Sequence, residues 1–424
     1  MESSLPIYKR KKLLIIGGGF AGMNLAQELM KSEIYQIILI DRNNYNYFPP
    51  LLYQVATSFL DPSSISYPFR KLFRNEQVTF RMGELMKVDP TNRVAYLDNG
   101  KLHYDELVFA TGARTNFFGN ENIKNNALPM KTIDDALMMR NALLKTLERA
   151  SVCTDPDERR KLLTIVVAGG GPTGVEVSGM LAEMKKHILT KDYPEIKSSG
   201  GEIYIVDGGE NLLAPMSEKT HQETQRALTR LGVHVKLKTR VADFKNAVVT
   251  LNNGETIAAQ TLIWAAGITA NTFEGIPQEA LGPGQRMITD QFNKVTGLEH
   301  IYAIGDSSIM TTDPAYPRGH PQLAQVAIQQ GRNLAANFLA IAYDKQSKPF
   351  IYFDKGDMAI VGRHNAVVDM FKHKVHLSGV AALFIWLFIH LISLVSYTNK
   401  LKTLYNWSVA YLSKDQSLRM IFRS

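Results

Sequence analysis

The sequence predicts an α/β protein with two parallel sheets, because one strand-turn-helix pattern occurs twice along its 424 residues. The first copy contains LIIGGGFAG (14–22) and the second contains IVVAGGGPTG (165–174). In each copy a short apolar run, typical of a buried parallel strand, precedes the glycine spacing G-x-G-x-x-G and a helical pattern. We therefore predict two Rossmann-like dinucleotide-binding domains.

The first glycine turn has the features that bind a dinucleotide pyrophosphate. Gly17 and Gly19 allow a tight turn without side chains in the way, and Gly22 opens a helix whose amide groups attract an anion. The helical pattern MNLAQELMKS leads to the strand IILID, which ends at Asp41, 22 residues beyond Gly19. A carboxylate at this distance is expected to accept hydrogen bonds from a ribose.

The second glycine turn repeats this arrangement with Gly169, Gly171 and Gly174. The helix VEVSGMLAEMKKHI follows, and then the strand GEIYIVD, which ends at Asp207. Asp207 lies 36 residues beyond Gly171, a gap that a longer helix and loop can absorb. The duplication predicts that the chain binds two different dinucleotides.

Three later segments complete the pattern. Each copy ends in an apolar strand and a turn of small residues, LVFATGA (107–113) and LIWAAGI (262–268). Further along, HIYAIGD (300–306) predicts a strand that delivers Asp306 to a turn. This segment resembles the motif with which two-dinucleotide flavoproteins hold the ribityl chain of FAD.

That resemblance implies domain boundaries. In two-dinucleotide flavoproteins the FAD-binding domain is discontinuous, and we expect it over residues 1–125 and 290–350. An NADH-binding domain would be inserted at 126–289, and residues 351–424 would form a C-terminal amphipathic helical region that anchors the protein to a membrane. One turn would hold a resident flavin and the other a nicotinamide that comes and goes, so that hydride passes between two rings.

Cysteine content and the N-terminus exclude several functions. The single cysteine, Cys153, excludes an internal disulfide, a CxxC redox pair and a thiolate zinc cluster, and it fits a reducing compartment. Multi-cysteine sulfide:quinone chemistry and haem or iron–sulfur ligation have no support either, and we expect no metal site. The N-terminal MESSLPIYKRKK has no apolar signal core, so we expect no secretory cleavage.

The formal net charge of +8 is concentrated in the tail. Residues 372–424 contain seven lysines and arginines against one acid, a net charge of +6, which leaves about +2 for the other 371 residues. A basic tail beside strongly apolar residues favours an anionic membrane surface as partner. Nucleic acid is the poorer interpretation, because the excess of basic residues belongs to the tail and not to the main body.

The segment 379–397, GVAALFIWLFIHLISLVSY, is the most apolar of the chain. Its 19 residues reach the lower limit for a transmembrane helix. The polar residues at spacings of three and four predict one stripe on an apolar helix; they are His390, Ser393, Tyr397 and Lys400. We expect such a helix to face its own protein on one side and lipid on the other, with a single membrane span and a buried core helix as alternatives.

The next segment, LKTLYNWSVAYLSKDQSLRMIF (401–422), mixes basic residues with large apolar ones, namely Leu404, Trp407, Tyr411 and Leu412. This mixture is typical of a helix that lies in the membrane interface.

An earlier segment, PQLAQVAIQQGRNLAANFL (321–339), has a helical pattern that places Gln325 and Gln329 one turn apart on one face. Such a pair usually marks a polar helix face. Its position soon after Asp306 would bring the start of this helix to the flavin, where an amide could bind a flavin oxygen or a quinone carbonyl.

Five segments together resemble the bacterial type II NADH:quinone oxidoreductases, the alternative, non-proton-pumping NADH dehydrogenases of the two-dinucleotide-binding-domain flavoprotein superfamily. They are FPPLLYQVATSFL (48–60), GGGPTGVE (169–176), YAIGD (302–306), AQVAIQQG (324–331) and WLFIHL (386–391). The resemblance implies a monotopic protein on the cytoplasmic face of the cell membrane, commonly a homodimer, with non-covalent FAD. It also implies electron transfer from NADH to a membrane quinone without proton pumping.

The resemblance also implies binding residues. It implies FAD contacts at Gly17, Gly19, Phe20, Ala21, Gly22, Asp41, Arg42, Thr111, Gly112, Asp306, Ala324 and Gln325, with Gln325 over the isoalloxazine. It implies NADH contacts at Gly169, Gly171, Gly174, Glu176, Asp207 and Gly267. The quinone would contact Gln325, Gln329, Lys374, Gly379 and Trp386.

The expected reaction has two halves at one flavin. NADH gives hydride to N5 of FAD, and two electrons then pass to a quinone, which takes up two protons. Glu176, Gln325 and Gln329 are the candidate catalytic residues; the helix dipole alone could also favour Glu176, and His390 is a weaker candidate. Two alternatives remain at this stage: a soluble NADH-dependent reductase of a ferredoxin-like protein, and a non-enzymatic redox-sensing protein.

Overall fold

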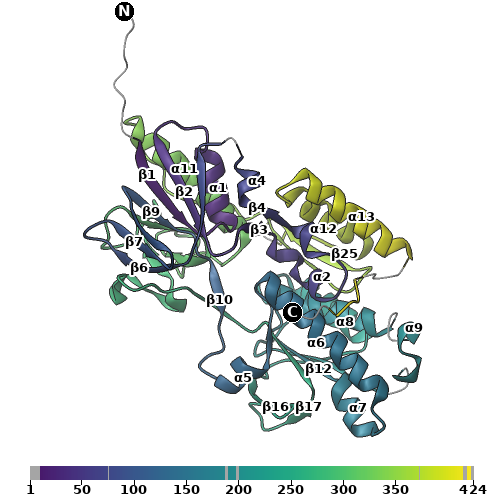
Figure 1. Cartoon of the computed structure of the whole chain (residues 1–424). Helices are drawn as coiled ribbons and strands as arrows, with labels where there is room; N and C mark the ends of the chain where they lie inside the picture. The colour runs from purple at the N-terminus through teal and green to yellow at the C-terminus, as the bar shows by residue number, and fades with distance from the viewer. Residues whose placement is uncertain are drawn as a thin grey trace, which may run out of the picture. The chain divides into compact units, whose positions relative to one another are not determined.

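The computed structural model describes residues 10–74, 76–186, 190–196, 200–371, 373–413 and 418–421 (Figure 1). The chain divides into two compact units. Unit 1 comprises Met1–Asn46, Tyr67–Arg114 and Ile268–Asp354, and unit 2 comprises Tyr47–Ser66, Thr115–Gly267 and Lys355–Ser424. The N-terminal residues on which the absence of a signal core was judged lie partly outside the described residues, as do Lys372, Lys414, Asp415 and Arg423 of the basic tail.

Unit 1 is built on a parallel sheet with the strand order β21-β9-β1-β2-β5. These strands are β1 (Lys11–Ile16), β2 (Tyr35–Asp41), β5 (Val78–Met82), β9 (Glu106–Phe109) and β21 (Ile301–Ala303). They are rich in Leu, Ile and Val because both faces of the sheet are covered. The strand that leads to Asp306 thus completes the first sheet, as expected for a discontinuous domain.

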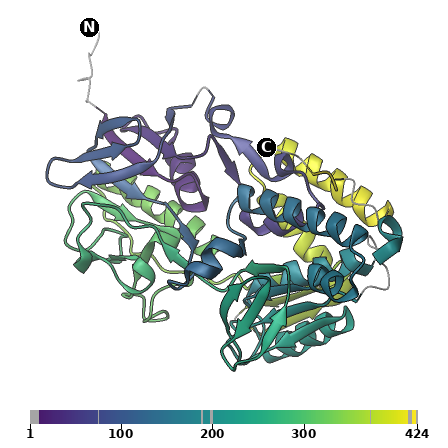
Figure 2. The ribbon, with the colours of Figure 1, turned by 60° about the horizontal axis from the view of Figure 1, so that its bottom comes forward.

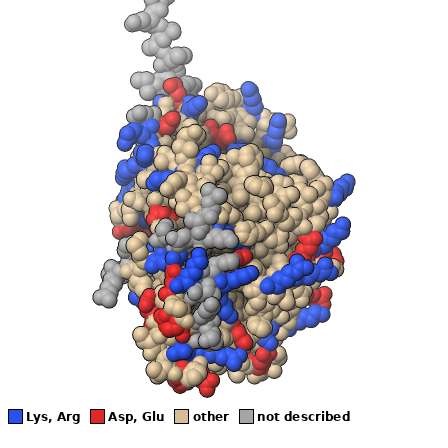
Figure 3. All heavy atoms as spheres, turned by 90° about the vertical axis from the view of Figure 1, so that its right-hand side faces the viewer, with Lys and Arg blue, Asp and Glu red and all other residues tan. Residues whose placement is uncertain are grey.

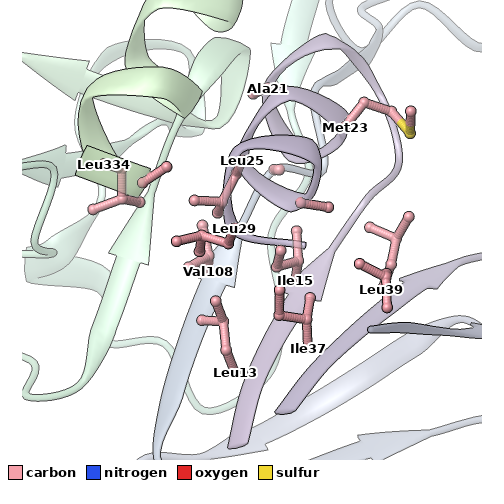
Figure 4. Close-up of a cluster of buried hydrophobic side chains, with 14 of the residues drawn as sticks. Leu13, Ile15, Ala21, Met23, Leu25, Leu29, Ile37, Leu39, Val108 and Leu334 are labelled. Carbon is pink, nitrogen blue, oxygen red and sulfur yellow. The ribbon is translucent and has the colours of Figure 1, made fainter. Parts of the chain in front are cut away.

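Two helices pack together over one face of this sheet, α1 (Phe20–Leu29) and α11 (Ala324–Ala342). Figure 4 shows side chains of β1, β2 and α1 pointing toward one another, with Leu334 of α11 beside them. The two helices approach closely at Gly331, where a Cβ would lie 2.5 Å from the Ala21 carbonyl oxygen. This packing holds the start of α11 to the sheet that carries the first glycine turn.

The other elements of unit 1 are short. They are α4 (Phe69–Leu72), the antiparallel sheet of β6 (Leu85–Asp89), β7 (Val94–Leu97) and β8 (Gly100–His103), the 3-10 turns η4 (Gln278–Ala280), η5 (Pro283–Gln285) and η6 (Gly305–Ser307), and the parallel pair β20 (Met287–Thr289) and β22 (Ser308–Met310). Because β20 pairs with β22, residues 268–289 join unit 1, whereas the sequence-based boundary lay at 289.

Unit 2 contains a second parallel sheet with the order β11-β18-β12-β13-β14. Its strands are β11 (Leu128–Pro129), β12 (Ile165–Ala168), β13 (Ile203–Val206), β14 (Val233–Lys236) and β18 (Thr261–Trp264). Unit 2 also contains a small antiparallel sheet of β15 (Val241–Lys245), β16 (Val248–Leu251) and β17 (Thr256–Ala258). Buried apolar residues of the two sheets form one cluster. Figure 2 shows the ribbon from a second direction.

The helices of unit 2 that precede the C-terminal region are α5 (Glu121–Asn126), α6 (Ile133–Val152), α7 (Pro156–Leu163), α8 (Pro172–Met184), α9 (Thr190–Asp192) and α10 (Glu218–Arg230), with the 3-10 turn η3 (Pro194–Ile196). The long helix α6 begins in a capping box, in which Thr132 and Asp135 satisfy each other's backbone amides.

The segment 47–66 belongs to unit 2, although the sequence placed it inside the first domain. It forms η1 (Pro49–Leu51), α2 (Leu52–Ala56) and α3 (Pro62–Ile65). Asn399 of the C-terminal region donates hydrogen bonds to the Ser64 and Ser66 carbonyl oxygens at 3.0 and 2.8 Å. The chain crosses between units near β3 (Tyr45–Tyr47), β4 (Ser66–Pro68), β10 (Ala113–Thr115) and β19 (Ile268–Ala270).

The C-terminal region is not purely helical, which corrects the sequence-based expectation. It begins with an antiparallel sheet of β23 (Asp357–Ile360), β24 (Ala366–Met370) and β25 (Val375–Ser378). This sheet packs against α8 and α10, and a Cβ at Gly179 of α8 would lie 2.5 Å from the Gly362 nitrogen. The helices α12 (Gly379–Ser393) and α13 (Tyr397–Ser413) follow and contact each other.

The predicted single polar stripe was wrong, because the helix stops at Ser393 and a new one begins at Tyr397. Trp407, one of the large apolar residues of the expected interfacial helix, is buried, and its indole N–H donates to Gln54 Oε1 at 2.8 Å. No described helix is both long and apolar enough to cross a membrane.

Candidate active site

The first glycine turn needs two of its glycines for steric reasons. Gly17 has a φ of +102°, and a Cβ there would lie 2.3 Å from the Ala110 carbonyl oxygen. A Cβ at Gly22 would lie 2.0 Å from the Gly17 carbonyl oxygen. Gly19 is different, because a Cβ there would meet no protein atom within 4 Å. The open space at Gly19 is therefore where a ligand can approach the backbone.

Asp41 is fastened to this turn. Its Oδ2 accepts a hydrogen bond from the Gly18 N–H at 2.7 Å, and its Oδ1 accepts one from the Asn43 N–H at 2.8 Å. Burial raises the pKa of Asp41, although these two amides act in the opposite direction. Each carboxylate oxygen still has a second lone pair, so the group can orient the turn and also accept from a ribose hydroxyl.

The second glycine turn reproduces this geometry closely. Gly169 has a φ of +113°, and a Cβ at Gly174 would lie 1.8 Å from the Gly169 carbonyl oxygen. Asp207 accepts from the Gly170 and Gly209 N–H groups at 2.6 and 2.7 Å. A Cβ at Gly171 would again meet no protein atom within 4 Å. The sequence repeat is thus a repeat of one binding geometry.

Both turns suit a diphosphate. The helices α1 and α8 begin after Gly19 and Gly171 with no side-chain cap and no acidic residue in the first turn. Their N-terminal amides and helix dipoles therefore offer positive potential to an anion. The two sites fit two dinucleotides, one in each unit.

Three elements of unit 1 meet at the Asp306 turn. Asp306 lies in η6, directly after β21. The Thr111 and Ser307 hydroxyls are hydrogen-bonded at 3.1 Å, so the turn that ends the first copy adjoins Asp306. Buried Gln330 of α11 accepts from the Gly305 N–H at 2.6 Å. Sequence reasoning missed Gln330, whose only signal was a glutamine on the apolar side of a helix.

The glutamine pair of α11 is half-buried. The Gln329 amide donates to the Phe353 carbonyl oxygen at 2.9 Å, and its Oε1 accepts from the Phe353 N–H at 3.0 Å. Gln329 therefore fastens the 350–354 segment to α11. The other residues predicted to contact FAD also belong to unit 1. They are Ala324 and Gln325 of α11, and Phe20, Ala21 and Arg42 near the first glycine turn in sequence.

Glu176 lies in the second turn of α8, beyond the first-turn position where the helix dipole would favour it. The side chain is buried, and its Oε1 accepts from the Ile360 N–H at 3.4 Å. Burial raises the pKa of Glu176 from 4.5 to about 8, against the opposing effects of this amide and the Trp386 side chain. A carboxyl with this pKa is mostly protonated at neutral pH.

Aromatic side chains surround this acid in unit 2. Trp386 is fully buried and stacks on His390 with ring centroids 3.7 Å apart, and Tyr53 meets Trp386 edge-on at 6.4 Å. Burial lowers the pKa of His390 to about 4, so its ring is neutral near pH 7. Tyr53 in turn accepts from the Gln54 amide at 2.9 Å.

The remaining predicted quinone residues are less enclosed. Gly379 begins α12 with a φ of +72°, and its N–H donates to Asn365 Oδ1 at 2.9 Å. Lys374 is exposed in the turn between β24 and β25.

Gly267, predicted to contact NADH, follows β18 and lies under the Phe118 ring. Across the described ranges, no group of three or more His, Cys, Asp or Glu side chains could hold a metal ion.

Known proteins match most of the chain. Residues 11–331 match the family model for pyridine nucleotide-disulphide oxidoreductases, and residues 355–414 match that for the NDH2 C-terminal domain. The type II NADH:quinone oxidoreductase Ndh of Mycobacterium tuberculosis is 34% identical over 418 residues, covering 96% of this chain and 89% of the relative. The type II NADH:quinone oxidoreductase of Staphylococcus aureus is 28% identical, covering 85% of this chain and 90% of the relative.

A solved structure shares the fold. The structure of NDH2 from Plasmodium falciparum in complex with NADH aligns with a TM-score of 0.89 at 23% identity. The alignment covers 98% of this chain and 100% of the other chain.

Proposed function

The chain belongs to the type II NADH:quinone oxidoreductase family, and on that premise we propose which of its residues carry out the reaction. It is an enzyme that oxidises NADH and reduces a quinone through a flavin. The repeated glycine turn supports the use of two dinucleotides in this reaction, because each copy leaves the same open space at the start of an uncapped helix. The family membership decides against the ferredoxin-reductase and redox-sensor alternatives.

We place FAD on unit 1. The turn at Gly17, Gly19 and Gly22 would hold its pyrophosphate, Asp41 its ribose, and Asp306 its ribityl chain. The FAD supplies the redox chemistry, since it can take hydride from a nicotinamide and release electrons to a quinone. The contact between Thr111 and Ser307 supports a single continuous site along the ends of β1, β9 and β21.

We place NADH on unit 2, with its pyrophosphate at Gly171 and its adenosine ribose at Asp207. In this placement the carboxylate of Asp207 would lie where the 2′-phosphate of NADPH would have to bind. This negative charge favours NADH over NADPH.

On unit 2, Glu176 would hold a proton near the nicotinamide of NADH. Its raised pKa, about 8, keeps the carboxyl protonated at neutral pH, because burial disfavours the charged form. The buried Trp386 and Tyr53 rings keep water away from it. Gln325 and Gln329 would orient the quinone carbonyls through their amides.

We also propose that α12 and α13 contact a lipid bilayer. Large apolar side chains are exposed along both helices, namely Val380, Phe384, Phe388, Ile392, Leu401, Leu404 and Tyr405. Figure 3 shows a broad area without charged side chains on the side of the molecule where these helices lie in Figure 1. An exposed apolar surface of this kind marks a lipid or protein contact. The sequence resemblance alone supports the homodimer and the cytoplasmic face of the membrane.

Steady-state NADH oxidation tests the function. The purified protein should reduce a short-chain quinone at a rate comparable to that with ferricyanide. Turnover with ferricyanide but none with any quinone would contradict the proposed acceptor.

A further inference from the structure

The segment 116–120 is held at both ends by hydrogen bonds, at one end to the second parallel sheet and at the other to the small antiparallel sheet of β15 to β17. The Asn116 N–H donates to the Gly267 carbonyl oxygen at 3.0 Å, and the Trp264 indole donates to the Asn116 carbonyl oxygen at 2.8 Å. At the other end, Asn120 Nδ2 donates to the Ala242 carbonyl oxygen at 2.8 Å. The segment therefore holds a fixed position on unit 2.

Phe118 lies between these anchors and is exposed. Its side chain is 66% accessible, although its backbone N–H is held by Asn116 Oδ1 at 2.8 Å. Its φ is +51°, in the left-handed region that a bulky side chain rarely adopts. A largely exposed aromatic ring on a strained, well-anchored backbone points to a ligand contact.

The ring lies at one particular end of the sheet. It meets Trp264, the last residue of β18, with centroids 6.4 Å apart, and a Cβ at Gly267 would lie 2.7 Å from Phe118 Cζ. Dinucleotides bind across the carboxyl ends of such strands. Phe118 is thus at the edge of the sheet where ligands bind.

Strand order identifies which half of the ligand is on this side. The second glycine turn follows β12, and Asp207, which marks the adenosine ribose, follows β13 on one side of it. β18 is the neighbour of β12 on the other side. A dinucleotide with its pyrophosphate at Gly171 therefore extends its nicotinamide over the end of β18.

We propose that the nicotinamide half of NADH packs against the Phe118 ring. The inference rests on the proposed placement of NADH at Gly171 and Asp207. A flat, apolar aromatic face suits the nicotinamide ring, and the anchored backbone limits the ordering cost of binding.

The test uses the full-length, FAD-loaded protein. Anaerobic rapid mixing with NADH gives the Kd and the limiting rate of flavin reduction, and inhibition by ADP reports the adenosine half alone. Phe118→Ala should raise the Kd for NADH roughly threefold to tenfold. In Phe118→Ala three other properties should stay unchanged, namely the flavin content, the rate of reoxidation by quinone and the inhibition constant of ADP. Phe118→Tyr, which keeps an aromatic ring, should have the wild-type Kd for NADH.

Asp207→Ala separates the two hypotheses. This substitution should weaken the binding of both NADH and ADP, because Asp207 is placed at the adenosine ribose that the two ligands share. If Phe118→Ala binds NADH as tightly as the wild type while Asp207→Ala binds ADP more weakly, the role of Phe118 is overturned. The placement of NADH on unit 2 then still stands. Equal weakening of ADP and NADH by Phe118→Ala also overturns it. If Asp207→Ala leaves both ligands unaffected, the placement of NADH itself fails.

Discussion

At the scale of single residues, Gly19 and Gly22 play different parts in the same turn. A side chain at Gly22 would collide with the Gly17 backbone, whereas one at Gly19 would enter open space. Gly19→Val should therefore fold but lose FAD, since its branches would fill the space of the pyrophosphate. Flavin absorbance and thermal unfolding measure the two properties.

Gly171→Val is the matched control, because Gly171 has the same open surroundings in the second turn. It should keep FAD and lose NADH binding. Full flavin content in Gly19→Val would show that the first turn does not hold the cofactor.

Glu176 makes stability depend on pH. Burial raises the pKa of Glu176 from 4.5 to about 8 in the folded protein. Between these values the folded state holds a proton that the unfolded state has released, so stability falls as pH rises through this window. Glu176→Gln removes the penalty and should be more stable than the wild type by about 3 kcal/mol at pH 7.

Thermal unfolding measures this pH dependence of stability, over a range of roughly pH 4 to pH 9 that spans both pKa values. The difference between Glu176→Gln and wild type should be small at the acid end and grow until about pH 8. Glu195→Gln, which removes an exposed carboxyl of unit 2, is the control. A difference that is constant over the whole range would mean that folding does not raise the pKa of Glu176.

At the scale of elements, α11 connects the Asp306 turn with the 350–354 segment through side chains on two of its faces. Gln330 holds the Gly305 N–H, and Gln329 holds the Phe353 backbone. Gln329→Leu should leave flavin reduction by NADH at the normal rate and slow reoxidation by quinone. Rapid mixing separates the two half-reactions.

Asn333→Leu is the control for an indirect effect, because Asn333 also fastens this stretch, by donating to the Lys348 carbonyl oxygen at 3.3 Å. Slow reoxidation in Gln329→Leu alone supports contact between its amide and the quinone. An equal defect in both variants would assign the effect to the loosened segment, and a defect only in the NADH step would contradict the quinone role.

The elements also show what a sequence can predict. The glycine turns were predictable, because their function depends on local geometry that a few adjacent residues determine. The strand leading to Asp306 was predictable for the same reason. Three features were not predictable, because each depends on contacts between residues far apart in sequence. They are the role of Gln330, the place of residues 47–66 in unit 2 and the sheet of β23 to β25. The break after Ser393 was missed because the apolar run continues through it.

At the scale of the whole molecule, the tail is both part of unit 2 and the proposed membrane contact. Trp386 and Trp407 are buried in unit 2, so truncation before α12 would remove part of its core. Point variants on the outer face of α12 are a cleaner test. Phe384 and Phe388 are 67% and 62% exposed and lie one turn apart.

The double variant Phe384→Glu, Phe388→Glu should bind vesicles of phosphatidylcholine and phosphatidylglycerol at least roughly 100-fold more weakly, because two phenylalanines no longer enter lipid. It should keep its FAD and its NADH:ferricyanide activity, and lose most activity with a long-chain quinone in those vesicles. Val152→Glu, at a 79% exposed apolar residue elsewhere in unit 2, should change none of these. Unchanged sedimentation of the double variant with vesicles, in high salt as well as low, would contradict the bilayer contact, because an apolar anchor resists salt while a purely electrostatic one does not.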